Sequence, residues 1–468
     1  MTETISVSDL LLYTVMLLTR HPEISQAFKA KCKLMLIDEA QDLSLLQLRI
    51  ISLLTDNPIL IGDMKQQIYG FNGACQEVVA EFHKLFPNCH DLKLTQSFRC
   101  KNEIANYATQ IILPNEVGGE DYKGIGEGGV VALKNGLYEE GADIVGLCSK
   151  LHTEFIANNN RLPREYLFLT RNNISILPVV EELFKQGLPF RVNKYTPAYD
   201  IPVIKELCEL LKLADQPQSI NNVMALKYLI PEFRGYYNIL EHPLYQVCKH
   251  SGCSIFEVNY QFKNIPLASK AMEILVEVHE MLNSGATVGE MFNKLWPMYE
   301  ENWLRQNAWR LEAKPDYYIN SVQVLTKKNY SQFIQDEVQK GNIIQECERD
   351  GRGVRCYTMH ASKGLEADVV YIIDANKGLI PNESKLKKMV EKHCDMDAAR
   401  AIREERALCY VACTRAREEL YIVHSGIPAE LLLGENPYEQ FDKVYSYYRT
   451  SGDDIKAFEQ FTERYVPQ

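Results

Sequence analysis

Two short apolar runs, each followed by acidic residues, most constrain how this chain folds. Leu34 to Ile37 runs directly into Asp38 and Glu39, and Ile59 to Ile61 is followed after one glycine by Asp63. Apolar runs this short that end at turn residues are typical of buried parallel strands, and in open α/β sheets ligands bind beyond the carboxyl ends of such strands. We therefore predict that the three acids lie at one edge of one sheet. Adjacent carboxylates there suit magnesium and an attacking water, because one can hold the metal on nucleotide phosphates while its neighbour takes the proton.

Length and composition set the class of protein. A chain of 468 residues is too long for one core and predicts two to four domains. With 46% hydrophobic and 24% charged residues, the composition is that of a globular protein. The net charge of −11 argues against a surface that attracts nucleic acid everywhere, so positive charge for DNA would have to be gathered in a groove.

The sequence favours an intracellular protein. The longest apolar run near the start, Leu10 to Leu18, is too short to span a bilayer, and Glu3 and Asp9 stand where a signal peptide carries basic residues. Thirteen cysteines without paired CxxC spacing fit reduced thiols. We expect a soluble, cytoplasmic chain with no membrane partner.

The pattern of apolar residues predicts an α/β chain interrupted by a helical segment. Helices are expected at 43–54, 76–86 and 176–186, and further strands at 166–169, 190–192, 355–359, 369–373 and 420–423. Residues 202–346 show helix after helix, and the glycine-rich segment 115–129 is the best linker candidate. The predicted boundaries are 1–114 for a first α/β domain, 115–201 with 347–430 for a second, 202–346 for the insertion and 431–468 for a helical tail.

Three later segments carry further polar groups. LTQSFRCKNEIANYATQIIL predicts a strand end that turns into a helix containing Arg99. YTMHASKGLEADVVYIID places His360, Lys363 and Glu366 in a loop between two strands. EERALCYVACTRAREEL predicts a helix that presents Arg415.

These segments together resemble a known family. DEAQD, GDMKQQIYGF, QSFR, TMHASKGLE and YVACTRA are similar, in this order, to the motor segments of superfamily 1 DNA helicases of the UvrD/Rep/PcrA type. The QQIY spelling and LTQSFR resemble the F-box DNA helicase branch in particular. Each segment alone is a weak signal, and the resemblance rests on their conjunction from near Ser8 to about His424. It implies an α/β fold of two RecA-like parallel-sheet lobes, the first incomplete, with a helical insertion in the second.

The resemblance also implies ATP and Mg²⁺ as cofactors. By this resemblance Asp38 holds magnesium, Glu39 is the base for the attacking water, and Gln66 senses the terminal phosphate. Glu366 matches the residue that touches the nucleotide sugar.

Two arginines match phosphate-contacting positions of the family. Arg415 matches the arginine that reaches the terminal phosphate, and Arg99 resembles a second one from the other side of the cleft. A planar, permanently charged guanidinium meets the charge that builds on the transferred phosphoryl oxygens, and such a residue can raise the rate by about 10³ to 10⁵.

The implied substrate is single-stranded DNA, with a duplex junction as a further contact and movement from 3′ to 5′. Phe71 matches the position where the family often has a tryptophan that stacks on a base, and Tyr69 and His360 are further DNA-side candidates. Stacking contributes about 1 to 3 kcal/mol per base whatever the sequence. Packing of Tyr69 under the loop is an equally good interpretation of that residue.

The chain departs from the family in several places. ATP hydrolysis in the family uses a loop GxxxxGK followed by Ser or Thr, whose amides cradle the phosphates, yet no glycine here is followed by lysine. We expect a protein partner or a separate segment to supply this Walker A loop. Asn72 stands where relatives have arginine, and residues 233–236 are the nearest analogue of the hairpin that relatives place on duplex DNA.

Three alternatives remain open from the sequence. The first is a catalytically silent DNA-binding or adaptor protein. The second is a nuclease, for which Asp121-Tyr122-Lys123 imitates part of a motif but lies in the glycine-rich segment and not on a strand. The third is a zinc site, whose spacing matches no common template and favours ordinary structural residues; its four candidates are His242, Cys248, His250 and Cys253.

Overall fold

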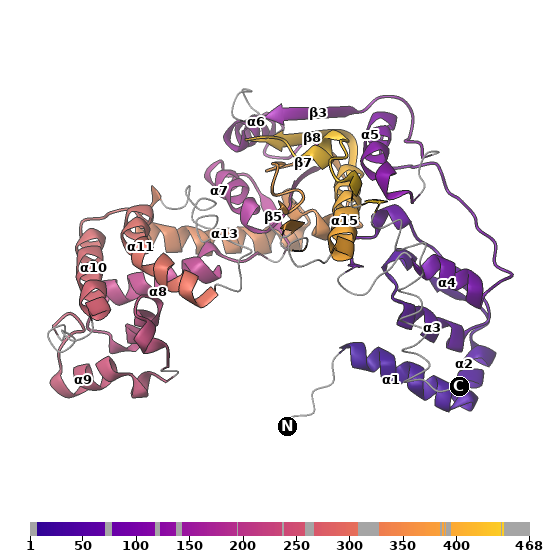
Figure 1. Cartoon of the computed structure of the whole chain (residues 1–468). Helices are drawn as coiled ribbons and strands as arrows, with labels where there is room; N and C mark the ends of the chain where they lie inside the picture. Colours follow the sequence, from indigo (N-terminus) through magenta and orange to yellow (C-terminus); the bar gives the residue numbers. More distant parts are fainter. Residues whose placement is uncertain are drawn as a thin grey trace. The chain divides into compact units, whose positions relative to one another are not determined.

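Parallel β-sheets organise the protein (Figure 1). The computed structural model describes residues 7–70, 77–117, 122–136, 143–193, 195–235, 238–257, 266–307, 327–383, 386–387, 389, 395–440 and 442–443. A two-stranded sheet joins β1 (Met35–Ile37) to β2 (Pro58–Leu60), and a six-stranded sheet has the order β3-β8-β7-β4-β6-β5. The predicted α/β class with parallel strands is confirmed.

The six-stranded sheet is built from segments far apart in the sequence. Its strands are β3 (Val130–Asn135), β4 (Tyr166–Thr170), β5 (Phe190–Val192), β6 (Val354–Thr358), β7 (Ala367–Ile372) and β8 (Ala416–His424). The pairs β3–β8, β7–β8, β4–β7 and β5–β6 all run parallel. Every residue of β4 is buried, as expected for a strand covered on both faces.

Contacts divide the chain into two compact units. The first consists of Met1–Asp143, Arg164–Arg171 and Thr358–Gln468, and the second of Ile144–Pro163 and Asn172–Tyr357. Every predicted site residue belongs to the first unit.

The first unit begins with helices around β1 and β2: α1 (Val7–Arg20), α2 (Pro22–Lys31), α3 (Leu45–Leu54) and α4 (Glu77–Leu85). α3 starts where it does because Ser44 forms a capping box: its hydroxyl accepts from the Gln47 amide, while the Gln47 side chain accepts from the Ser44 amide. Leu48 of α3 then packs with Val78 and Phe82 of α4. Leu60 of β2 packs against this small core.

Two further helices of the first unit pack against strand β8. α5 (Asn102–Ile112) and α15 (Asp395–Cys413) lie side by side, and both contact β8 (Figure 1). The buried residues of α5 are Ile104, Ala105, Ala108, Ile111 and Ile112, which recur at helical spacing and form one apolar face. The packed pair positions the turn before α5, which carries Arg99, and the turn after α15, which carries Arg415.

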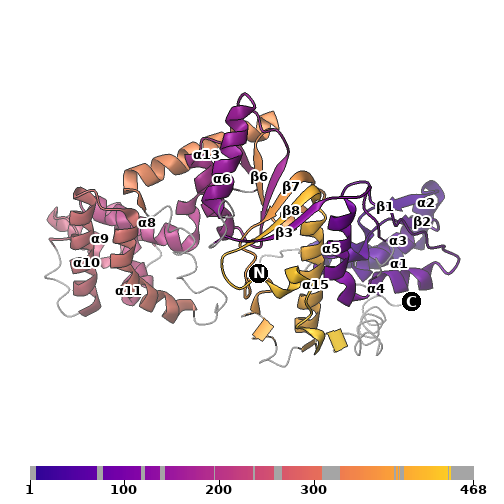
Figure 2. The same ribbon diagram turned by 90° about the horizontal axis from the view of Figure 1, so that it is seen from above.

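The second unit is mostly helical. It contains α6 (Ile144–Ala157), α7 (Leu177–Lys185), α8 (Pro202–Asp215), α9 (Pro243–Ser251), α10 (Pro266–Asn283), α11 (Val288–Asn307) and α13 (Tyr330–Asp350). One continuous core runs from Leu177 to Phe333, and α10 packs against both α8 and α11 (Figure 2). Between residues 202 and 346 the described part of the chain is helical and holds no strand.

Two predicted helices end elsewhere than expected. Arg99 lies before α5, in a turn where the Ser97 hydroxyl accepts from the Arg99 amide, and not inside a helix. Arg415 follows the end of α15, and the next residues form β8 and not a continued helix. Pairing of β8 with both β3 and β7 outweighs the helical propensity of the sequence AREEL.

Described residues of the glycine-rich segment pack against neighbouring elements. Gly124 lies so close to the backbone of Cys100 and Asn102 that an added Cβ would meet their atoms at 2.6 Å. Tyr122 contacts the ring of Tyr410 on α15. Strand β3 and helix α6, which follow this segment, were not predicted because their sequences lack a clear period.

In the described part of the chain, no helix combines the length and apolar character that a membrane span requires.

Candidate functional site

The predicted acids follow the paired ends of β1 and β2. The Ile61 amide donates to the Ile37 carbonyl at 2.8 Å and the Ala40 amide to the Ile61 carbonyl at 2.9 Å, so the two chains stay paired beyond the strands. Asp38 is exposed, and its carboxylate accepts the Glu39 amide at 2.9 Å. Glu39 adopts a left-handed conformation with φ of 52°, an uncommon one for a residue with a side chain. The two carboxylates therefore stand at the sheet edge, open to solvent.

Gln41 ties Glu39 to the second loop. Its side-chain amide donates to Glu39 Oε2 at 2.5 Å, and its Oε1 accepts the Asp63 amide at 3.0 Å. Gln41 is only 1% exposed. Gly62 makes this approach possible, because a Cβ there would lie 2.5 Å from Gln41 Oε1.

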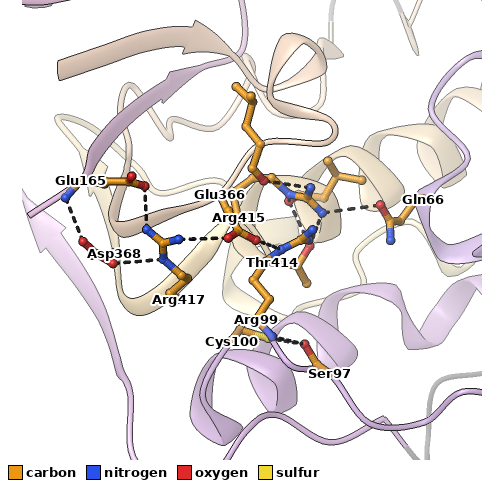
Figure 3. Close-up of polar contacts among 12 residues, drawn as sticks. Gln66, Ser97, Arg99, Cys100, Glu165, Glu366, Asp368, Thr414, Arg415 and Arg417 are labelled. Atoms are coloured by element: carbon orange, nitrogen blue, oxygen red, sulfur yellow. Dashed lines mark hydrogen bonds and ion pairs between the residues drawn. The ribbon is translucent and has the colours of Figure 1, made fainter. Parts of the chain in front are cut away.

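Gln66 continues the chain of hydrogen bonds toward Arg415. Its Nε2 donates to Asp63 Oδ2 at 2.9 Å. Its Oε1 accepts Arg415 Nη2 at 3.5 Å, as Figure 3 shows. Lys65 also contacts the Asp63 carboxylate, at 2.7 Å. We call the path through Glu39, Gln41, Asp63, Gln66 and Arg415 the glutamine relay; its last contact is the longest.

Arg415 is held almost wholly by carbonyl and hydroxyl groups. It is 1% exposed, and its guanidinium donates to the carbonyls of Val411 (2.8 Å) and Leu365 (3.1 Å). Burial, reinforced by the positive charge of Arg99, lowers the pKa of Arg415 to about 10. The side chain is therefore charged at neutral pH and has no carboxylate partner among the ion pairs described, so it is suited to meet an anion.

Arg99 lies in a separate charge network of the same unit. Its Nε donates to Glu366 Oε2 at 2.9 Å, while Arg417 Nη1 donates to Glu366 Oε1 at 3.0 Å (Figure 3). Arg417 also contacts Asp368 and Glu165. The hydrogen bond from Arg99, with the charges of both arginines, lowers the pKa of Glu366. The carboxylate is fixed and ionised between two guanidinium groups.

Lys363 reaches the acids from the turn after β6. Its ammonium lies 2.6 Å from Asp42 Oδ2 and 3.1 Å from Glu39 Oε2. The same nitrogen lies over the ring of Tyr69, 5.2 Å from its centroid. The Lys363 ammonium thus contacts two other segments of the chain, the turn after β1 and the loop after β2.

The predicted DNA-side residues are only partly described. Tyr69 is half-buried, which is compatible with stacking on a base and with packing under the loop. Phe71 and Asn72 lie outside the described residues. His360 begins a short 3₁₀ turn, and burial, with the charge of Arg171, lowers the pKa of its imidazole to about 4. His360 is therefore neutral at pH 7 and cannot act as a phosphate-binding cation.

The donor set fits magnesium held mainly by a nucleotide. Mg²⁺ is commonly bound by one or two carboxylates together with phosphates and water, and Asp38 and Glu39 are adjacent hard oxygen ligands at an open edge. In the described part of the chain, no group of three or more His, Cys, Asp or Glu could hold a metal ion by itself. This finding gives no support to the zinc alternative at residues 242–253. Asp121, which the nuclease alternative needs, lies outside the described residues.

The structure brings together most of the predicted residues, in two groups. Glu39, Gln66 and Arg415 share the glutamine relay, whereas Arg99 and Glu366 share the arginine network. Sequence reasoning assigned no role to Gln41, Lys363 or Arg417. Gln41 could have been noticed, because it is the only uncharged polar residue in DEAQD. No sequence pattern predicts that Lys363 contacts Asp42 and Glu39.

Comparison with known protein families gives two matches. Residues 1–87 match the UvrD/REP helicase N-terminal domain, and residues 312–426 match the UvrD-like helicase C-terminal domain. The two matched segments contain Asp38, Glu39, Asp63, Glu366 and Arg415, whereas Arg99 and Glu165 lie outside both.

Individual relatives agree with the family matches. The chain is 26% identical over 456 residues to "ATP-dependent DNA helicase PcrA" of Staphylococcus aureus strain MRSA252, covering 90% of this chain and 59% of the relative. Proteins of the same name from Bacillus subtilis strain 168 and Staphylococcus epidermidis strain ATCC 35984 are 24% and 25% identical over 454 residues, with the same coverage. The chain thus spans 59% of the length of the curated relatives it matches. The resemblance to superfamily 1 helicases of the UvrD/PcrA type is confirmed.

Proposed function

We propose that this chain, a relative of the superfamily 1 helicases of the UvrD/PcrA type, forms the larger part of an ATP-driven motor on single-stranded DNA. Its relatives bear the name ATP-dependent DNA helicase. We propose movement from 3′ to 5′ on the resemblance alone. We also propose that the protein acts inside the cell, where its DNA substrate is found.

One observation supports this proposal above the others. The glutamine relay joins Glu39, which follows β1, to Arg415, which follows α15, although 376 positions separate them in the sequence. Phosphoryl transfer needs a base for water and a cation for the developing phosphate charge near the same group. A chain of hydrogen bonds that joins these two side chains supports their placement around one such group.

We assign the roles as follows. Glu39 accepts the proton of the attacking water, Asp38 would hold Mg²⁺, and Gln66 senses the terminal phosphate. Bound Mg²⁺ would neutralise charge on the phosphates. The same assignment gives Arg415 and Arg99 the transferred phosphate and Glu366 the ribose.

We propose that the phosphate-binding loop is supplied by residues outside these 468. No glycine in the sequence precedes a lysine, so the family's loop is not encoded here. An apolar face on the two-stranded sheet supports docking of a further segment: Leu34, Leu36, Ile59 and Ile61 share one face and are 54%, 61%, 47% and 48% exposed. Parallel sheets are usually covered on both faces, and unpaired strand edges are pairing templates.

The test is reconstitution. The chain is mixed with a polypeptide that carries the GK-type loop and its strand, for which the open reading frame directly upstream is the first candidate. We expect ATP hydrolysis that single-stranded DNA stimulates, and Glu39→Gln should lower kcat by at least about 100-fold, because general-base contributions are typically 10²–10⁴-fold. Lack of hydrolysis with every loop-bearing candidate would contradict the motor.

A second function is favoured by the absence of a Gly-Lys pair from the sequence: a DNA-binding or adaptor protein that does not hydrolyse ATP. It would bind single-stranded DNA in a salt-sensitive manner, because phosphate contacts release counterions, and ATP would not alter the binding. Glu39→Gln would then have no effect on any nucleotide-dependent property.

A further inference from the structure

Lys363 has a partly enclosed position against the candidate catalytic acid. Its side chain is 9% exposed, and its ammonium contacts both Asp42 and Glu39. Charge-assisted contacts of this kind are stronger than neutral hydrogen bonds. The carboxylate proposed as the base for water therefore already bears a cation.

Asp42 is the firmer of the two anchors. Its contact with Lys363 is 2.6 Å, compared with 3.1 Å for Glu39, and its carboxylate is 23% exposed against 54% for Glu39. Asp42 Oδ1 is buried and has no hydrogen-bond partner among the described residues. Burial raises the pKa of Asp42 while the hydrogen bond from Lys363 opposes this rise, so the ionised carboxylate depends on the ammonium.

The third neighbour of Lys363 is an aromatic ring. The ammonium lies over Tyr69 at 5.2 Å from the ring centroid, which is within the range of a cation–π contact. A nucleobase stacks on the face of an aromatic side chain. A base and the ammonium cannot occupy the same face of Tyr69 at once.

We infer that Lys363 is a positioning residue that couples DNA binding to the acid pair. While its ammonium covers Tyr69 it also holds Glu39 and Asp42, and a base that stacks on that face displaces it from all three groups. Displacement leaves the Glu39 carboxylate able to accept a proton from water. The inference rests on the proposed function, because it uses Tyr69 as a DNA contact.

Mutual exclusion makes the coupling reciprocal. If DNA binding displaces Lys363 from Asp42 and Glu39, then removing either of these contacts must raise the affinity of the chain for DNA, because linkage between two binding events is reciprocal. Binding of DNA to the isolated chain thus tests the coupling without any hydrolysis. The effect is measurable even where the phosphate-binding loop is absent.

The experiment measures the Kd of a fluorescein-labelled oligothymidylate by anisotropy at one fixed salt concentration. Asp42→Asn should lower the Kd by about fivefold, at the small end of usual coupling factors. The control is Asp56→Asn, which removes an equal charge from an exposed carboxylate paired with Lys29 at 2.6 Å and should change the Kd by less than about twofold. In a Lys363→Gln background, Asp42→Asn should no longer alter the Kd.

Two further variants separate the possible failures. Glu39→Gln removes the longer ion pair and should lower the Kd by a smaller factor than Asp42→Asn, which provides a second measurement if Asp42→Asn does not fold. If Tyr69→Ala weakens binding but neither acid variant differs from Asp56→Asn, the coupling is wrong and the proposed function stands. If the unaltered chain binds no oligothymidylate, the proposed DNA site fails and the coupling fails with it.

Discussion

At the scale of single residues, the site is defined by how its charges are partnered. Arg415 is buried among carbonyl groups, whereas Arg99 is paired with Glu366. Only the first is held without a carboxylate among the ion pairs described, so Arg415 can meet an incoming anion without breaking an ion pair. Arg99 would have to exchange Glu366 for a phosphate oxygen.

His360 gives a prediction about pH. Its pKa is about 4 in the folded chain and near 6.5 in the unfolded chain, so the unfolded state binds more protons between these values. The free energy of unfolding should therefore fall as the pH drops from 6.5 toward 4, by up to about 1.4 kcal/mol per pH unit from this residue. His360→Asn should remove this part of the slope in urea denaturation measured from pH 7 to pH 5. Equal slopes for the two proteins would contradict a buried, neutral imidazole.

Some residue roles were accessible from sequence and others were not. Asp38 and Glu39 follow a strand, and the short apolar run that ends at them predicted their place at a sheet edge. Lys363 could be located in its loop, but its contact with Asp42 depends on the path of a flexible side chain across 321 positions of sequence. Such long-range pairings leave no local pattern.

At the scale of elements, loops and not helices carry the functional groups. The turn after β1, the loop after β2, the turn before α5 and the turn after α15 each present at least one predicted site residue. Apolar runs identified most of the strands, because buried parallel strands are nearly continuously apolar. The helices predicted to contain Arg99 and Arg415 were wrong at their ends, where Ser97 and the pairing of β8 determine the local structure.

Gly62 gives a prediction about the loop after β2. In Gly62→Ala the new methyl group would lie 2.5 Å from Gln41 Oε1 and 3.1 Å from the Ala40 amide nitrogen. Gln41 must then shift, and the Asp63 amide loses its acceptor. We expect a loss of about 1–3 kcal/mol in the free energy of unfolding and faster hydrogen exchange at the Asp63 amide.

The matched control for Gly62 is Gly341→Ala. Gly341 lies within α13, and an added Cβ there would have no atom within 4 Å. Replacing this glycine inside a helix by alanine should raise the free energy of unfolding by roughly 0.5–1 kcal/mol. If both variants behave alike, the close approach of Gln41 to Gly62 is not what constrains the loop.

At the scale of the whole molecule, one set of contacts joins the two segments that match helicase domains. Residues 1–87 and 312–426 match different helicase domains, and the glutamine relay joins a side chain from each. Similarity to these domains does not by itself establish that Glu39 and Arg415 act in the same reaction, because relatives at 26% identity can differ in their sites. The central claim is that these two side chains serve one nucleotide.

The most direct test of that claim is a double-mutant cycle on ATP hydrolysis by the reconstituted protein in the presence of single-stranded DNA. Residues that act as a unit in catalysis are strongly non-additive. We predict that kcat of Glu39→Gln with Arg415→Lys is about equal to that of the more damaged single variant. If the two losses instead multiply, Glu39 and Arg415 act independently and the single-site account is contradicted.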